Sequence, residues 1–172
     1  MAKYTGVSAS GGIAILVPAT GGGHPTLWNP TDSGVNVHVR RLELSYVSGN
    51  NAPCALEWAA VTNTGAAVAT GAPIATATLV APVSILGQGV NNKARWSPTT
   101  NTFTAAPAFL RPTGISLFTG VAATAVAPFT LIAQYEQDDF VLGPGSAVCL
   151  CNQTTTTTAV FQVGVTWEEI AA

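Results

Sequence analysis

The sequence predicts an all-β protein that folds as an antiparallel β-sandwich of about eight strands. Several segments alternate apolar and polar residues with a period of two, which is the pattern of a half-buried strand. Groups of turn-forming residues separate these segments, for example at residues 48–51, 112–114 and 143–145. No segment shows an apolar face with helical spacing and capping residues, so we expect no helix.

The clearest predicted strand lies near the C-terminus. In residues 161–168 every second side chain is apolar, and the positions between them are polar or glycine. Because a strand points successive side chains to opposite faces, the apolar residues should share one buried face. They are Phe161, Val163, Val165 and Trp167.

A second long strand is predicted over residues 35–47. Its apolar residues occupy odd positions up to Val39 and even positions from Leu42 onward. The change falls at the basic pair Arg40 and Arg41. A β-bulge at this pair would return all the apolar side chains of the strand to one face. These side chains belong to Val35, Val37, Val39, Leu42, Leu44 and Tyr46.

Further strands are expected around these two. In a strand that begins at residue 54, Cys54, Leu56 and Trp58 should share one face, and Cys149 and Cys151 should do the same in a later strand. The other expected strands cover residues 13–17, 74–86 in one or two pieces, 115–118 and 129–135, and the later cysteines lie in a strand at 147–151. A domain of about eight such strands favours a jelly roll, the common eight-stranded sandwich.

The chain has the length of a single domain. We assign residues 24–172 to this β-sandwich domain and residues 1–23 to an N-terminal segment or arm. The arm packs on its own subunit or reaches into a neighbour, and the sequence leaves both choices open. Residues 88–110 fit the strand pattern least well, because Pro98 and Pro107 interrupt them, so we expect a long excursion there.

Charged residues are scarce in this chain. Only 14 of the 172 residues are charged, six basic and eight acidic, and 48% are hydrophobic, whereas an ordinary soluble domain is about 25% charged. So weakly charged a surface is expected to be buried against something other than water, and lipid and protein are the two choices. The best apolar run, residues 13–17, is five residues long, while a membrane-spanning helix needs about 20. We expect a protein cover, no membrane and, because no signal peptide is recognised, folding in the cytoplasm.

The scarcity of charge also argues against nucleic-acid binding and against enzymatic catalysis. A net charge of -2 with six scattered basic residues provides no nucleic-acid footprint. The acidic residues at 136–139 are interpreted as a solvated turn, although paired carboxylates with Glu168 are also compatible with a polysaccharide hydrolase. Cys149 and Cys151 are interpreted as buried thiols, and a metal half-site is the alternative. We predict no enzymatic activity, no metal and no cofactor.

Six residues are candidates for contacts with another protein. Two form the basic pair of the second strand, and four are basic or aromatic residues of the excursion at 88–110. The aromatic residues of this excursion either fold back over the edge of their own core or contact a neighbour. The candidates are Arg40, Arg41, Lys93, Arg95, Trp96 and Phe103.

Four stretches of the chain resemble small structural proteins of tailed-bacteriophage virions. They cover residues 27–39, 44–49, 141–146 and 165–170, and the first begins Leu27-Trp-Asn-Pro-Thr. Proteins of this type have β-sandwich or jelly-roll domains and commonly assemble as trimers that decorate or cement the head. The resemblance covers short, turn-rich motifs near both ends of the chain and implies no site residues.

The resemblance implies a homotrimeric, non-enzymatic protein that binds the outer capsid lattice and stabilises it by bridging capsid subunits. Its partners would be copies of itself and the major capsid protein or another virion protein. Its place would be the capsid surface of a virion assembled in the host cytoplasm. The scarcity of charge agrees with this expectation, because an uncharged surface can be buried against identical copies. A receptor-binding or fibre-tip jelly-roll module of a phage virion is the alternative.

Overall fold

The computed structural model of the chain describes residues 2–8, 10–49, 54–61, 83–84, 92–98, 100–103, 105–117, 130–136, 138–154 and 159–172. Within these residues the chain forms β-strands joined by turns and loops, and it contains no helix. The predicted all-β class is confirmed. None of the described residues belongs to a helix long and apolar enough to cross a membrane.

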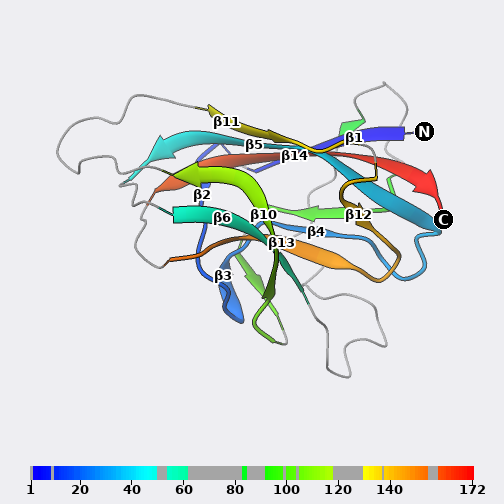
Figure 1. The fold of residues 1–172 in the computed structure, drawn as a ribbon, viewed down its shortest axis with the longest axis horizontal. Helices are drawn as coiled ribbons and strands as arrows, with labels where there is room; N and C mark the ends of the chain where they lie inside the picture. The colour runs from blue at the N-terminus through cyan, green and yellow to red at the C-terminus, as the bar shows by residue number, and fades with distance from the viewer. Residues whose placement is uncertain are drawn as a thin grey trace.

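Two antiparallel sheets pack face to face and form a β-sandwich (Figure 1). The seven-stranded sheet has the order β11 (Thr130–Gln134), β5 (Val35–Ser48), β14 (Val160–Ala171), β1 (Ala2–Val7) and β7 (Val83–Ser84), with β12 (Val141–Leu142) also paired to β5 and β2 (Ile13–Ala14) to β14. The five-stranded sheet has the order β10 (Ala108–Leu117), β6 (Cys54–Ala60), β13 (Ala147–Asn152), β4 (Thr26–Trp28) and β8 (Arg95–Ser97). A small two-stranded sheet consists of β3 (Gly21–Gly23) and β9 (Thr100–Thr102).

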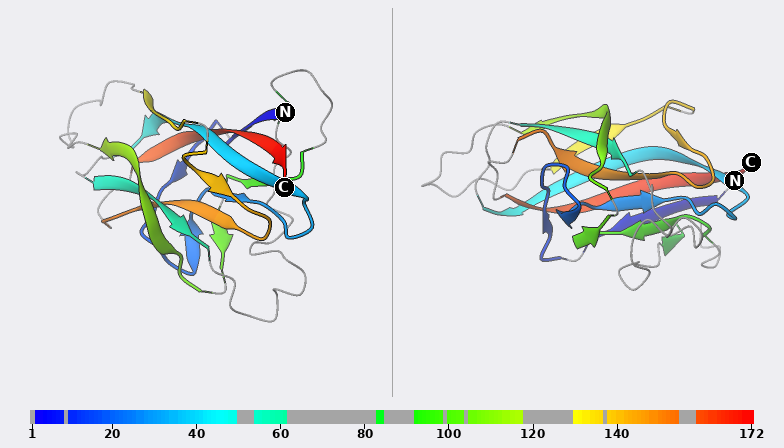
Figure 2. Two further views of the ribbon diagram at one scale, coloured as in Figure 1. Left: turned by 45° about the vertical axis from the view of Figure 1, so that its right-hand side comes forward. Right: turned by 90° about the horizontal axis from the view of Figure 1, so that it is seen from below.

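The first three strands of each large sheet form pairs of sequence neighbours. β11 of the seven-stranded sheet corresponds to β10 of the five-stranded sheet, β5 corresponds to β6, and β14 corresponds to β13. In Figure 1, β11, β5 and β14 lie above β10, β6 and β13. The chain therefore crosses from one sheet to the other at each of these pairs. Both termini lie at one end of the sandwich, as Figures 1 and 2 show.

Strand β5 contains the predicted β-bulge. Arg41 is paired with Thr166 of β14 and Val39 with Trp167, so Arg40 is the extra residue. The bulge returns the apolar side chains on both sides of it to the core face. The fully buried ones are Val37, Val39, Leu42 and Leu44, and Val35 and Tyr46 pack partly buried against the same core. The predicted shared face is therefore confirmed.

The predicted faces of two other strands are also confirmed. The four apolar residues predicted to share a face of β14 are fully buried in the main core, namely Phe161, Val163, Val165 and Trp167. In β6, Leu56 and Trp58 are fully buried and Cys54 is 8% exposed. The opposite face of β6 is covered as well, because Ala59 packs with Phe103 in a second, smaller cluster. The five-stranded sheet thus has apolar packing on both faces.

The excursion predicted at 88–110 contributes structure to the sandwich. It contains β8 and β9, and Trp96 of β8 is paired with Leu27 and fully buried in the main core. The expected strand at 115–118 begins earlier, at Ala108, and runs through Pro112. A proline is tolerated there because β10 is an edge strand. The register of β10 on β6 shifts between Phe109 and Arg111, and again between Pro112 and Ser116. Most of the expected strand at 74–86 lies outside the described residues.

Candidate functional site

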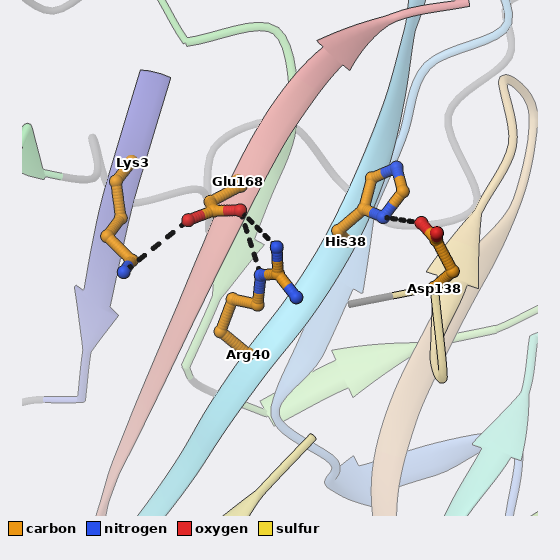
Figure 3. A network of polar contacts seen from close by, with 5 residues as sticks. All are labelled: Lys3, His38, Arg40, Asp138 and Glu168. Carbon is orange, nitrogen blue, oxygen red and sulfur yellow. Dashed lines mark hydrogen bonds and ion pairs between the residues drawn. The ribbon is translucent and has the colours of Figure 1, made fainter. Parts of the chain in front are cut away.

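Charged side chains gather on the outer face of the seven-stranded sheet, which is the face turned away from the core. The inner positions of β1, β14 and β5 are apolar, so the alternate positions point outward. Lys3 of β1 is paired with Glu168 of β14, and Glu168 is paired with His38 of β5. The bulge places Arg40 beside them, so three neighbouring strands bring these side chains together (Figure 3).

Glu168 lies between two cationic side chains. Its Oε1 is 3.4 Å from Lys3 Nζ. Its Oε2 accepts hydrogen bonds from Arg40 Nε at 2.8 Å and from Arg40 Nη2 at 2.5 Å. The side chains of Glu168 and Arg40 are 12% and 16% exposed, while that of Lys3 is 40% exposed. The Arg40 guanidinium is therefore held in one orientation by two bonds to a single oxygen.

The environment of Glu168 lowers the pKa of its carboxyl below the ordinary value of 4.5. Burial raises this pKa, but the hydrogen bonds and charges of Arg40 and Lys3 lower it by more. A carboxyl whose pKa is lowered by folding stabilises the folded state above its unfolded pKa. The stabilisation from Glu168 is therefore fully present above about pH 4.5 and is lost as the pH falls through the lower folded value.

Replacement of Glu168 by Gln is expected to reduce this acid sensitivity. The variant should be less stable than the wild type at pH 7, because Arg40 and Lys3 lose their counter-charge, and the difference should shrink as the pH falls below 4.5. Urea unfolding at a series of pH values from 7 to about 3 measures both curves. Parallel curves for the two proteins would contradict this assignment of the ion pairs.

An open hollow of about 490 Å³ lies beside this network on the same face. Three basic side chains and one carboxylate line the hollow. Arg41, one of the basic residues, also forms an ion pair with Glu43, and both side chains are about 40% exposed. The lining residues are Lys3, Arg40, Arg41, Gln134, Tyr135, Thr166 and Glu168.

The acidic residues at 138–139 are bound to other parts of the chain. Asp138 Oδ1 is 3.1 Å from His38 Nδ1, on the side of β5 away from Glu168 in Figure 3. Arg111 Nη1 donates to the backbone oxygen of Asp139 at 2.6 Å. The Asp139 carboxylate also lies 3.8 Å from Arg111 Nη2. The two carboxylates thus face different side chains, whereas a glycoside hydrolase places two carboxylates on opposite sides of one bond. This arrangement is that of a tethered turn.

Two cysteines of β13 lie close to His24, the residue that follows β3. Cys149 Sγ and Cys151 Sγ are 3.5 Å apart on one face of β13, as predicted, and both residues are fully buried. His24 Nδ1 is 3.7 Å from Cys151 Sγ, and its ring stacks on Phe103. The hydrogen bond between the thiols, followed by burial, raises the pKa of Cys149. The same bond and His24 lower the pKa of Cys151 below its usual range, although burial acts in the opposite direction. The described residues contain no group of three or more ligands that could hold a metal ion.

The six candidate contact residues fall into three places. Arg40 and Arg41 line the hollow. Lys93 and Arg95 are exposed at the start of β8, where the backbone N–H of Lys93 donates to Glu169. The two aromatic candidates, Trp96 and Phe103, are buried in their own chain at 0% and 4% exposure. Of the two roles that the sequence left open for them, the described fold shows packing on their own core.

Sequence reasoning missed Lys3 and Gln134 as members of the hollow. Lys3 lies in the segment interpreted as an arm, yet it belongs to β1, which is paired with β14. Gln134 lies opposite Arg41 in the neighbouring strand β11. Both contacts depend on the register between strands that are far apart in the sequence, and local alternation carries no information on that register.

No protein-family model matches the chain, and comparison with curated proteins and with solved structures finds no significant match.

Proposed function

We propose that the chain is a non-enzymatic structural protein of a tailed-bacteriophage virion. In this proposal it is a homotrimeric jelly roll that binds the outer capsid lattice and cements neighbouring capsid subunits. Its partners are copies of itself and the major capsid protein, and its place is the capsid surface. The support comes from three features of the described residues, namely where the charges are used, how the strands cross, and which apolar side chains stay exposed.

The use of the charges is the observation that carries the proposal. Four of the six basic residues and three of the eight acidic residues form ion pairs within the chain, and a fourth acidic residue, Asp138, lies 3.1 Å from His38. Two further carboxylates, Glu57 and Glu169, accept hydrogen bonds from Gln153 and from the backbone N–H of Ala94. A surface on which most of the few charges are already paired or hydrogen-bonded can be buried against protein at lower desolvation cost than a surface of free charges.

The strand order supports a jelly roll as the form of the sandwich. In a jelly roll the chain alternates between two antiparallel sheets, so sequence neighbours face each other across the core. The described strands do this at three successive positions, where β10, β6 and β13 match β11, β5 and β14. Jelly rolls are frequent in viral shells, where many copies pack side by side.

Exposed apolar residues at one side of the sandwich support self-association. β10 and β11 are edge strands of the two sheets and contact each other. Phe109 and Leu110 on β10 are 51% and 53% exposed, and Ile132 on β11 is 49% exposed. Edges with large exposed apolar residues are where another chain packs. All four tryptophans of the chain are buried, so no indole ring is exposed to pack on a sugar, which favours lattice packing over glycan recognition.

The mass in solution tests the trimer. Analytical ultracentrifugation of the wild type is expected to give three times the chain mass of 17.5 kDa. The double variant Phe109→Asp/Ile132→Asp should sediment as a monomer, because it places charges in the proposed contact. Val47→Asp is the matched control, since Val47 is 41% exposed on a different strand, and it should remain trimeric. A monomeric wild type would overturn the trimer.

The position of the protein in a virion tests the cement role separately. A reconstruction of the intact particle is expected to show the chain on the outer head surface, in contact with more than one capsid subunit. Particles assembled without it should release their DNA at a lower temperature. Location at the tail tip, or absence from the virion, would contradict the proposal even if the protein is a trimer.

A further inference from the structure

We propose that the hollow on the outer face of the seven-stranded sheet binds a carboxylate from an acidic peptide segment of a partner protein. The inference deepens the proposed function, and it rests on that function for the partner being a protein. It is carried by the charge balance of the hollow, the unused donors of its basic side chains, and the fixed position of Arg40.

Half of the basic residues in the chain line this one hollow. Lys3, Arg40 and Arg41 are three of six basic residues, although they come from two different strands. Glu168 is the one acidic residue of the lining. With the Arg41–Glu43 pair counted as neutral, the side chains around the hollow still carry one positive charge in excess. A chain of net charge -2 thus presents a local positive site, and such a site attracts an anion.

The basic side chains retain donors that no described residue uses. Arg40 directs Nε and Nη2 to Glu168, which leaves Nη1 available. Arg41 reaches Glu43 through Nη2. Lys3 Nζ has three donors and one ion-pair partner. The hollow therefore offers at least one N–H from each of three cations, together with the neutral groups of Thr166 and Gln134.

Arg40 is also preorganised for binding. It occupies the bulge of β5, its side chain is 16% exposed, and Glu168 fixes its guanidinium. A side chain that is already ordered loses little entropy when a ligand arrives, so more of the interaction energy appears as affinity. A planar guanidinium with a free N–H and an adjacent ammonium matches a carboxylate oxygen well.

The chemistry of the lining favours an acidic peptide over a sugar acid or a phosphate chain. Sugar recognition commonly uses an exposed aromatic face, but Tyr135 is 8% exposed and its hydroxyl donates to the backbone oxygen of Thr113. A nucleic-acid backbone needs a row of cations along a groove, whereas these three converge on one hollow of about 490 Å³. An excess of one positive charge suits the side chain of a single Glu or Asp.

A defined peptide tests the proposal. Hexaglutamate with blocked ends is titrated into the wild-type protein at low ionic strength by isothermal titration calorimetry, with hexaglutamine as the neutral control. We expect binding of hexaglutamate that weakens as salt rises, and no binding of hexaglutamine. The double variant Lys3→Gln/Arg41→Gln should weaken binding at least tenfold and leaves the Arg40–Glu168 pair in place.

The matched control has the same change of charge elsewhere on the surface. Lys93 and Arg95 are exposed and do not line the hollow, so Lys93→Gln/Arg95→Gln should change the affinity less than twofold. Equal losses in the two double variants would show attraction by net charge alone and would overturn the site. Tighter binding of sialyllactose or inorganic phosphate than of hexaglutamate would overturn the peptide assignment. These measurements do not depend on the mass or the virion position, so a failure here is distinct from a failure of the proposed function.

Discussion

Deletion of Glu43 is expected to leave no detectable folded protein, whereas deletion of Arg40 in the same strand is expected to leave the fold intact. Both residues lie on β5, so each deletion shortens the same strand by one residue. The opposite outcomes follow from the bulge, where Arg40 is the extra residue between the partners of Thr166 and Trp167.

Deletion of Arg40 removes the extra residue and makes the ladder regular. Val39 and Arg41 become neighbours and keep their partners Trp167 and Thr166. Simple alternation then holds Val39 on the core face and Arg41 on the outer face, as in the wild type. The deletion removes the hydrogen bonds with Glu168, which are worth about 1.5–3 kcal/mol for a bond to a charged group, and the bond from the Tyr135 N–H to the Arg40 backbone oxygen, worth about 0.5–1.5 kcal/mol.

Deletion of Glu43 instead reverses the faces of two residues. Leu42 and Leu44 become neighbours, and neighbours in a strand point to opposite sides. If Leu44 stays in the core, Leu42 turns outward and Arg41 turns inward. Exposing a buried leucine costs about 1.5–3 kcal/mol, and an unpaired buried charge costs about 3–5 kcal/mol more. The sum is comparable to the whole stability of a domain, about 5–15 kcal/mol.

Soluble yield, circular dichroism and urea unfolding of the two deletions measure this difference. Arg40→Ala and Glu43→Ala are the controls, because they remove the same side chains without changing the length of β5. We expect both controls to fold. Equal stability of the two deletions would contradict the register of β5 on β14.

Replacement of Gly6 by Ala is expected to destabilise the protein by about 1–3 kcal/mol or more, the usual range for overpacking a core. A Cβ atom on Gly6 would lie 2.5 Å from Trp96 Cδ1 and 2.6 Å from Trp96 Cγ. Trp96 is fully buried in the main core, so its ring has no free space to enter. Urea unfolding followed by tryptophan fluorescence measures the change.

Gly11 provides the matched control for this substitution. No atom lies within 4 Å of a Cβ on Gly11, and its φ is outside the positive range. Gly11→Ala should therefore change stability by less than about 0.5 kcal/mol or raise it slightly, because alanine restricts the unfolded chain. The pair Gly6→Ala/Trp96→Phe should recover part of the loss, since the smaller ring makes room. Equal effects of Gly6→Ala and Gly11→Ala would contradict the close approach of β1 to Trp96.

Local sequence pattern predicted those features that depend on neighbouring residues. The change of parity at Arg40 and Arg41 was sufficient to predict the bulge, because the core face of one strand must be continuous. The shared face of Cys149 and Cys151 follows from the same alternation. These features need no knowledge of which strand lies alongside.

Contacts between distant residues were not predictable in this way. Glu168 meets Lys3 only because β1 lies against β14, and His24 reaches Cys151 across 127 residues of sequence. Trp96 was assigned to an excursion because Pro98 breaks the strand pattern, yet three residues of β8 are enough to place its ring in the core. The basic pair was recognised, but the hollow that it lines depends on strands whose register is set by the assembled sheet.

The position of β14 also determines when this protein can fold during its synthesis. β14 is the last of these strands to leave the ribosome, and in the sheet it lies between β5 and β1. Until residues 160–171 have emerged, β1 and β5 lack their shared partner, and their apolar faces and backbone groups stay exposed. Pairing of segments so far apart in sequence is slow. The nascent chain therefore carries unpaired, aggregation-prone strands until residues 160–171 have emerged.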